Sequence, residues 1–289
     1  MFRFKVADIV MDYYPYHEEF FGRRLSSYLC DEEKSDMRLE YKICENIELP
    51  THKITSKVHE ATVGVRDNGN LIMYFKAKSG KVIYYVEHSR DFSFNIAKSV
   101  SLKPTETVPL TDCDREYLRS GAVFNNRLIF SGGTMLHGSS ISYKGEGVIF
   151  SAPCGTGKST HTALWKKLYG SDVTYINDDK PVITLSTDGA MVSGAPWSGK
   201  TELNTNMCVP LKAIVFIERA EQNSIEVLST SQAFCYLCDQ TFPPFYSKEL
   251  SLKNIETVEK IMALVPIYIL SCNTEDAAAE LAKNKICNN

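Results

Sequence analysis

The sequence lacks an excess of charge of either sign. Its 289 residues include 32 Lys and Arg and 35 Asp and Glu, which gives a formal net charge of −3. A near-neutral chain has no overall electrostatic attraction to nucleic acid or to anionic membrane surfaces. We therefore expect no nucleic-acid partner.

Long apolar runs are also missing. No uninterrupted apolar stretch approaches the roughly 18 residues that indicate a membrane span. The segment from Met1 to Tyr16 places Asp8 and Asp12 among apolar residues, so it lacks the apolar core of a secretory signal. The nine cysteines are odd in number and scattered without a regular framework. We expect a cytoplasmic protein with reduced thiols and no membrane partner.

The length corresponds to about two domains at roughly 150 residues each. Residues 1–110 are mostly β in pattern, and residues 63–75 contain an Asp-Asn-Gly-Asn turn between two apolar runs, a strong hairpin signal. Residues 103–109 carry two prolines among polar residues and form the candidate linker. We expect a β-rich N-terminal domain over residues 1–110, with no role assigned, and a second domain over residues 111–289.

From residue 111 onward, short apolar strands alternate with helical patterns, which is typical of an α/β domain. Thr111 and Asp114 have capping-box spacing ahead of a short helix through Arg119. The predicted strands are Leu128–Phe130, Leu136–Tyr143, Val148–Ala152, Val173–Ile176, Val182–Leu185, Ala213–Ile217 and Ile267–Leu270. The predicted helices are Ser159–Leu168, Ser231–Gln240, Leu252–Leu264 and Thr274–Ala282.

The strongest chemical signal is a glycine loop, the segment Ala-Pro-Cys-Gly-Thr-Gly-Lys-Ser-Thr at residues 152–160. It lies between an apolar strand and a helical pattern, the context that a phosphate-binding loop requires. Two glycines let backbone N–H groups wrap a polyphosphate, a lysine reaches the terminal phosphates, and the serine hydroxyl suits Mg²⁺. One departure is Ala152, where the usual motif begins with glycine. The predicted nucleotide-binding residues are Gly155, Thr156, Gly157, Lys158, Ser159 and Thr160.

Asp178 and Asp179 form the second signal, directly after a short apolar strand. One carboxylate can hold Mg²⁺ while the other accepts a proton from an attacking hydroxyl. The alternative is a solvated turn before Pro181, because Asn and Asp are ordinary turn residues. We favour the catalytic interpretation because the glycine loop precedes this pair in the chain.

Three other residues are candidates. A lone histidine on a strand, such as His137, is more often structural than catalytic. Lys200, in a loop of small residues, would contact substrate or phosphate or else belong to a plain turn. Arg219 follows a strand and is either a cationic stabiliser or, as we favour, the partner of an adjacent glutamate in a surface salt bridge.

In this arrangement the chain resembles the HPr kinase/phosphorylase catalytic domain and its superfamily, which includes the ATP-dependent phosphoenolpyruvate carboxykinases. The matching segments are His137-Gly138, Gly145-x-Gly147-Val148, Gly155-x-Gly157-Lys158-Ser159 and Asp178-Asp179. The resemblance covers roughly residues 120 to 280 and implies the fold of that catalytic domain. It implies that Lys158 binds the β- and γ-phosphates and that Ser159 and Asp178 hold Mg²⁺. It also implies that Asp179 is the general base on a serine hydroxyl, with His137 close to the Asp pair.

The chain departs from the family at two places. Thr160 stands where HPr kinases usually have Glu, and residues 193–199 lack the Glu and Arg of the family's downstream segment. The sequence therefore does not predict HPr as the acceptor. It predicts a kinase that uses ATP and Mg²⁺ to phosphorylate an alcohol, in the first place a serine on a peptide or protein, or else a small metabolite.

The alternative is a nucleotide-binding regulatory or chaperone-like module without transfer activity. The phosphoryl donor (ATP, GTP or pyrophosphate), the reverse dephosphorylation and the formation of a homo-oligomer stay open at this stage.

Overall fold

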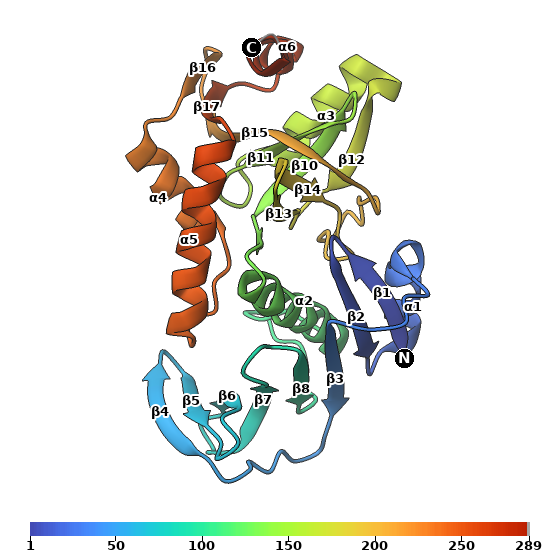
Figure 1. The fold of residues 1–289 in the computed structure, drawn as a ribbon, viewed down its shortest axis with the longest axis vertical. Helices are drawn as coiled ribbons and strands as arrows, with labels where there is room; N and C mark the ends of the chain where they lie inside the picture. Colours follow the sequence, from blue (N-terminus) through green and yellow to red (C-terminus); the bar gives the residue numbers. More distant parts are fainter. Residues whose placement is uncertain (288–289) are drawn as a thin grey trace. The chain divides into compact units, whose positions relative to one another are not determined.

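The computed structural model describes residues 1–287 and consists of two compact units. Unit 1 comprises Met1–Ser131 and Pro243–Ser251, and unit 2 comprises Gly132–Phe242 and the chain from Leu252 onward. The sequence places a domain boundary between residues 110 and 111. In the structure Thr111 is the N-cap of a helix of unit 1, and the chain passes from unit 1 to unit 2 between Ser131 and Gly132. Both units mix strands and helices, so the fold is a mixed α/β one (Figure 1).

Unit 1 contains an eight-stranded sheet in the order β1-β2-β3-β8-β7-β6-β5-β4. The hairpin expected at residues 63–75 is confirmed, since β5 and β6 pair antiparallel and Gly69 between them has a φ of 82°. The strands are β1 (Phe2–Val6), β2 (Ile9–Tyr14), β3 (Met37–Ile43), β4 (Lys53–Val58), β5 (Ala61–Val65), β6 (Leu71–Lys76), β7 (Val82–His88) and β8 (Phe94–Ser99). The helices are α1 (Glu18–Leu25), a short 3₁₀ turn (Ser26–Tyr28) and α2 (Asp112–Phe130).

The helix α2 begins as the sequence predicts. The Thr111 hydroxyl accepts a bond from the Asp114 N–H at 3.1 Å, and the Asp114 carboxylate accepts one from the Thr111 N–H at 2.8 Å. The helix continues to Phe130, well beyond the predicted end at Arg119, so the strand predicted at Leu128–Phe130 is wrong. A short apolar run cannot be told from a buried helical segment by periodicity alone.

Unit 2 is built on a mixed sheet in the order β12-β10-β11-β15-β14-β13-β9, with β17 also pairing with β15 and β16 with β17. The pairs β11–β15 and β15–β17 are parallel. The strands are β9 (Thr134–Met135), β10 (Gly138–Tyr143), β11 (Glu146–Ser151), β12 (Val173–Asn177), β13 (Val182–Ser186), β14 (Gly189–Ser193), β15 (Cys208–Arg219), β16 (Ser224–Val227) and β17 (Ile267–Cys272). The helices are α3 (Lys158–Tyr169), the 3₁₀ turn Gly170–Asp172, α4 (Thr230–Gln240), α5 (Lys248–Leu264), which belongs to unit 2 from Leu252 onward, and α6 (Asp276–Cys287).

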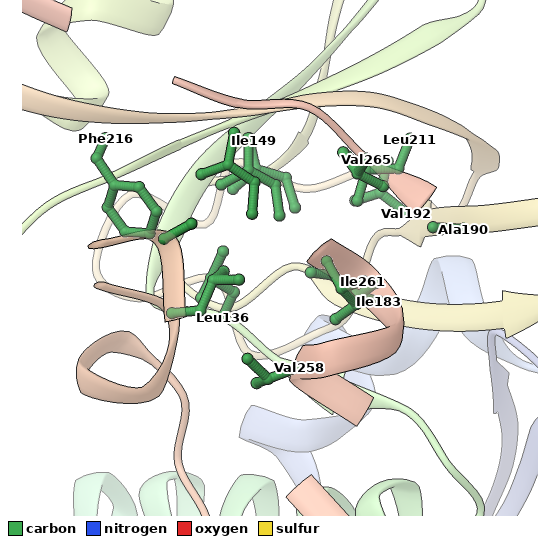
Figure 2. Packing of buried hydrophobic residues seen from close by; sticks show 14 of the residues in the cluster. Leu136, Ile149, Ile183, Ala190, Val192, Leu211, Phe216, Val258, Ile261 and Val265 are labelled. Atoms are coloured by element: carbon green, nitrogen blue, oxygen red, sulfur yellow. The ribbon is translucent and has the colours of Figure 1, made fainter. Parts of the chain in front are cut away.

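Helices cover both faces of the central strands of unit 2. Alternate residues of β11 and β15 point to opposite faces, as the two-residue period of a strand requires. Ile149 and Phe216 belong to one apolar cluster together with residues of α4 and α5, among them Val258 and Ile261 (Figure 2). A second cluster on the other face contains their strand neighbours and residues of α3 and α6, such as Trp165 and Ala279. The strand β11 and the helix α3, on either side of the loop, are therefore both packed into the apolar core.

Within residues 1–287, no helix has the length and apolar character needed to cross a membrane.

Two buried histidines give the fold a predicted pH dependence. Burial lowers the pKa of both His88 and His161 from 6.5 to about 4. The unfolded chain binds a proton on each histidine below pH 6.5, whereas the folded chain does so only near pH 4. The stabilising contribution of the two neutral histidines is therefore fully present above pH 6.5 and is lost as the pH falls from 6.5 to about 4. Each histidine adds a slope of about 1.4 kcal/mol per pH unit to the free energy of unfolding. We expect urea unfolding to show this loss between neutral and mildly acidic pH.

The His161→Gln variant isolates one of these contributions. The His161 Nε2 accepts a bond from the Trp165 Nε1–H at 3.2 Å, and a glutamine oxygen can replace it. This variant should lose about 1.4 kcal/mol per pH unit of the acid sensitivity. An unchanged pH dependence in His161→Gln would show that His161 is not buried as a neutral imidazole.

Candidate functional site

The glycine loop connects the end of β11 to the start of α3. Gly155 and Gly157 have φ values of 78° and 124°, backbone conformations that residues with a side chain rarely adopt. Gly157 is the N-cap of α3, and no described side chain caps this end of the helix. The first N–H groups of a helix lack partners within the helix, and together with the helix dipole they favour an anion at this end. The local conformation is therefore suited to bind phosphate.

Lys158 is the first residue of α3 and is only 8% exposed. Its Nζ donates to the backbone oxygens of Ala152 at 2.8 Å and Pro153 at 3.2 Å. Burial lowers the pKa of Lys158, and the nearby Cys154 thiol and the Asp179 and Asp178 carboxylates oppose this shift. The loop thus holds the ammonium group beside its own backbone, where an arriving phosphate would provide stronger acceptors.

Arg219, the last residue of β15, also binds the glycine loop. Its Nε donates to the Thr156 carbonyl at 3.1 Å, and its Nη2 donates to the Gly155 carbonyl. Among the described residues no ion pair joins Arg219 to a glutamate, so the predicted salt bridge is wrong. The adjacent Glu218 carboxylate instead accepts a hydrogen bond from the Tyr236 hydroxyl at 2.7 Å. The guanidinium thus holds two loop carbonyls, because strand β15 ends next to the loop.

A buried asparagine shapes the turn that carries the two aspartates. Asn177 ends β12, and its Oδ1 accepts bonds from the N–H groups of Asp179 at 2.9 Å and Lys180 at 2.6 Å. Its Nδ2 donates to the Ala195 carbonyl at 2.8 Å. Asp178 itself is only 7% exposed. The turn is therefore held in one conformation by its own side chain and by the loop after β14, and it is not an open, solvated turn.

Asp178 is tied to two other elements. Ser139 on β10 donates a hydrogen bond to the Asp178 Oδ1 at 2.5 Å, and the Ser139 and Thr162 hydroxyl oxygens lie 2.9 Å apart. Thr162 lies on α3, so these hydrogen-bonding contacts connect the helix that starts at the glycine loop to Asp178. Sequence reasoning missed Ser139 and Thr162, although Ser139 lies two residues after His137 and therefore on the same face of an extended chain.

Asp179 is surrounded by polar and aromatic groups. Its carboxylate forms an ion pair with the Lys180 ammonium group, and its Oδ1 lies 3.9 Å from His137 Nε2. The Phe242 ring lies next to both groups, with its centroid 6.1 Å from the centroid of the His137 ring and 5.8 Å from Lys180 Nζ. Lys180 was not predicted as a site residue. The only available signal was its position beside Asp179.

His137 is held between two strands rather than within one. The predicted strand Leu136–Tyr143 is interrupted, because β9 pairs with β13 whereas β10 pairs with β11 and β12. The His137 N–H donates to the Gln240 carbonyl at 2.8 Å at this break. Burial, and then the positive charge of Lys158, lower the pKa of His137, and the charge of Asp179 only partly opposes them. The imidazole is therefore neutral at neutral pH.

One pocket of about 350 Å³, which we name the lysine pocket, brings these residues together. All the predicted site residues except Thr156 line it, namely His137, Gly155, Gly157, Lys158, Ser159, Thr160, Asp178, Asp179, Lys200 and Arg219. Lys200 belongs to the loop after β14, which reaches the pocket with Ser198, Gly199 and Thr201.

The donor atoms around the lysine pocket suit a hard cation held jointly with phosphate. Among residues 1–287, no group of three or more His, Cys, Asp or Glu side chains could hold a metal ion alone. Ser159 and Asp178, which carry a hydroxyl and a carboxylate, both line the pocket. Mg²⁺ characteristically uses one or two protein oxygens and completes its shell with phosphate and water. The residues present fit Mg²⁺ on those terms.

Comparison with known protein families gives a match over part of the chain. The family model described as "ScmC: SynChlorMet cassette protein ScmC" matches residues 122–280, more than half of the chain. Among solved structures, the Hpr(Ser) kinase/phosphatase from Coxiella burnetii is similar at 11% identity and a TM-score of 0.33, over 53% of this chain and 97% of that chain. A similarity this weak says nothing about chemistry. No curated protein matches the chain.

Proposed function

The chain belongs to the ScmC family of SynChlorMet cassette proteins, whose name states no reaction, and we propose from the lysine pocket that it is a phosphotransferase. It would use ATP and Mg²⁺ to phosphorylate a hydroxyl group, and the acceptor we propose is a serine on a peptide or protein. The observation that carries this proposal is that one pocket gathers a buried lysine, a helix-start serine, two carboxylates and a neutral histidine. Phosphoryl transfer depends mainly on positioning and charge neutralisation, so these groups are sufficient machinery.

The nucleotide phosphates would bind at the start of α3. The N–H groups of the glycine loop and the Lys158 ammonium group would hold the β- and γ-phosphates. Ser159 and Asp178 would hold Mg²⁺, which neutralises charge on the transferring group. The hydrogen bond from Ser139 keeps the Asp178 carboxylate directed to this position. Arg219 would keep the loop backbone in its binding conformation through the two carbonyls that it contacts.

The acceptor would approach from the side of Asp179. Its hydroxyl oxygen forms the new bond to the γ-phosphorus while the bond from that phosphorus to the bridging oxygen breaks, and the hydroxyl proton passes to the Asp179 carboxylate. Lys180 neutralises Asp179 before the acceptor arrives and must move aside for the proton to be accepted. His137 stays neutral and adds no positive charge that would compete for the carboxylate.

The direct test is phosphoryl transfer. The purified chain is incubated with Mg-ATP and fractionated cell extract, and acceptors are identified by mass spectrometry as species that gain one phosphoryl group. We expect a peptide or protein phosphorylated on serine, dependent on both Mg²⁺ and ATP. Gain of the group on a metabolite would keep the reaction class and change the acceptor.

A second function, nucleotide binding without transfer, is favoured by one specific observation. The carboxylate proposed as base is already paired with Lys180. If that pair persists when nucleotide is bound, the base is blocked and the protein acts as a nucleotide-responsive module. Tight binding of Mg-ATP together with no phosphorylated species in any fraction would favour this function.

A further inference from the structure

Lys180 lies beside Asp179 but outside the lysine pocket. Its ammonium group forms an ion pair with the Asp179 carboxylate and lies 5.8 Å from the centroid of the Phe242 ring. Asp179 lines the lysine pocket, together with three other basic residues, whereas neither Lys180 nor Phe242 lines it. The positive charge for the phosphates is therefore supplied inside the pocket, and the charge of Lys180 has no role in binding them.

Only the side chain of Lys180 is free to leave Asp179, because the backbone at this turn is fixed. Asn177 Oδ1 accepts bonds from the N–H groups of Asp179 at 2.9 Å and of Lys180 at 2.6 Å. Pro181 follows and restricts the backbone of the residue before it. The ammonium group thus stays within side-chain reach of the carboxylate and is drawn back to it unless another anion holds it.

The protein itself does not supply that second anion. Among the described residues, Asp179 is the only ion-pair partner of Lys180. An anion that draws the ammonium group away must therefore arrive with a ligand, and the phosphates bind on the pocket side of Asp179, where Lys180 does not reach the lining. The remaining ligand of the proposed reaction is the acceptor.

We propose that the acceptor carries a carboxylate next to its hydroxyl group and that Lys180 selects for this carboxylate. The inference rests on the proposed function, because it takes Asp179 to be the base. The ammonium group moves from the Asp179 carboxylate to the acceptor carboxylate, which leaves Asp179 able to accept a proton. The hydroxyl oxygen then bonds to the γ-phosphorus, the bond from that phosphorus to the bridging oxygen breaks with its electrons on ADP, and the hydroxyl proton passes to Asp179.

The contact between Lys180 and Asp179 limits how far apart the two acceptor groups lie. The two side chains form an ion pair, so the carboxylate and the hydroxyl that replace this contact must be neighbours as well. In a peptide, an Asp or Glu next to the phosphorylated serine meets this condition. Phe242 is 40% exposed and offers an apolar contact to the same stretch of peptide. A small hydroxy acid has the same two groups, so the test separates the two sources.

The test measures which acceptors gain a phosphoryl group. The full chain and Mg-ATP are incubated with a mixture of peptides that have capped ends and varied residues around one serine, and the products are sequenced by mass spectrometry. We expect Asp or Glu next to the phosphorylated serine about tenfold more often than Asn or Gln, as one charge-assisted hydrogen bond provides. Glyceric acid and glycerol form the second arm, and phosphorylation of glyceric acid alone, with no peptide, would identify the acceptor as a small hydroxy acid.

The Lys180→Met variant removes the charge and keeps the length of the side chain. The preference for a carboxylate should disappear, with the KM for acidic acceptors raised about tenfold. Transfer of the γ-phosphoryl group to water should rise several-fold, because Asp179 is no longer paired. Lys180→Arg should keep the preference. A merely structural role would instead lower transfer to acidic and amide peptides alike.

A matched control is Lys212→Met. Lys212 also pairs with a carboxylate, that of Glu146 at 3.4 Å, and does not line the lysine pocket, so this variant should keep the preference of the parent chain. Equal phosphorylation of acidic and amide peptides by the parent chain would overturn the inference and leave the phosphotransferase in place. A tenfold loss of Mg-ATP affinity in Lys180→Met would also overturn it, because Lys180 would then belong to the phosphates. Transfer to no peptide, hydroxy acid or extract component would overturn the proposed function itself.

Discussion

Replacing Lys158 with alanine is expected to weaken Mg-ATP binding by about 10- to 100-fold and to reduce phosphoryl transfer further still, by about a thousandfold. A hydrogen bond to a charged group contributes about 1.5–3 kcal/mol, which corresponds to the loss in affinity. The larger loss in rate follows because the ammonium group also neutralises charge that develops during transfer in a site shielded from water. The measurements are calorimetric titration with Mg-ATP and single-turnover transfer to the acceptor.

The control for this variant lies on the same helix. Lys167 is exposed, forms an ion pair with Asp276 at 2.8 Å and does not line the lysine pocket, so Lys167→Ala removes the same charge from α3 without touching the loop. It should keep both ATP binding and transfer. Circular dichroism should show that Lys158→Ala remains folded, since within residues 1–287 its ammonium group donates hydrogen bonds to just two loop carbonyls. Transfer that survives Lys158→Ala would contradict the assignment of the glycine loop.

The second large effect is expected for Asp179→Asn. The amide has nearly the shape of the carboxylate but cannot accept the acceptor proton, so transfer should fall by at least about a hundredfold. ATP binding should stay within a few fold of the parent chain, because the proposed Mg²⁺ ligands are Ser159 and Asp178. The result would therefore be a loss in kcat with little change in the KM for ATP.

Two comparisons sharpen this test. Asp188→Asn, at an exposed turn between β13 and β14, should have no effect on either quantity. Asp178→Asn should instead weaken Mg-ATP binding, because this residue is proposed to hold the metal. An equal loss of ATP binding in Asp179→Asn would show that Asp179 acts mainly on the metal. Unimpaired transfer would exclude it as the base.

Some of the candidate site could be predicted because its signals are local. A glycine-rich turn between an apolar strand and a helix is encoded by consecutive residues, and the structure places β11 and α3 on either side of it. The capping box at Thr111 likewise depends on residues three positions apart. Where the local signal was ambiguous the prediction failed, as for the apolar run at Leu128–Phe130, which tertiary packing keeps in α2.

Other features depend on residues far apart in the chain. Arg219 reaches the loop from the end of β15 because β15 pairs in parallel with β11. Ser139 reaches Asp178 because β10 pairs with β12. No pattern within either segment specifies which strands become neighbours, so these contacts could not be predicted from the sequence.

The sequence by itself determined the glycine loop, the acidic turn and the residues that could hold phosphate and magnesium, because backbone conformation and side-chain chemistry are local properties. Only the tertiary structure decided that these residues share one pocket and that Lys180 forms an ion pair with Asp179. The physical reason is that strand order and register place side chains from distant segments within contact distance, and both are set by burial of the two apolar clusters on the faces of the sheet.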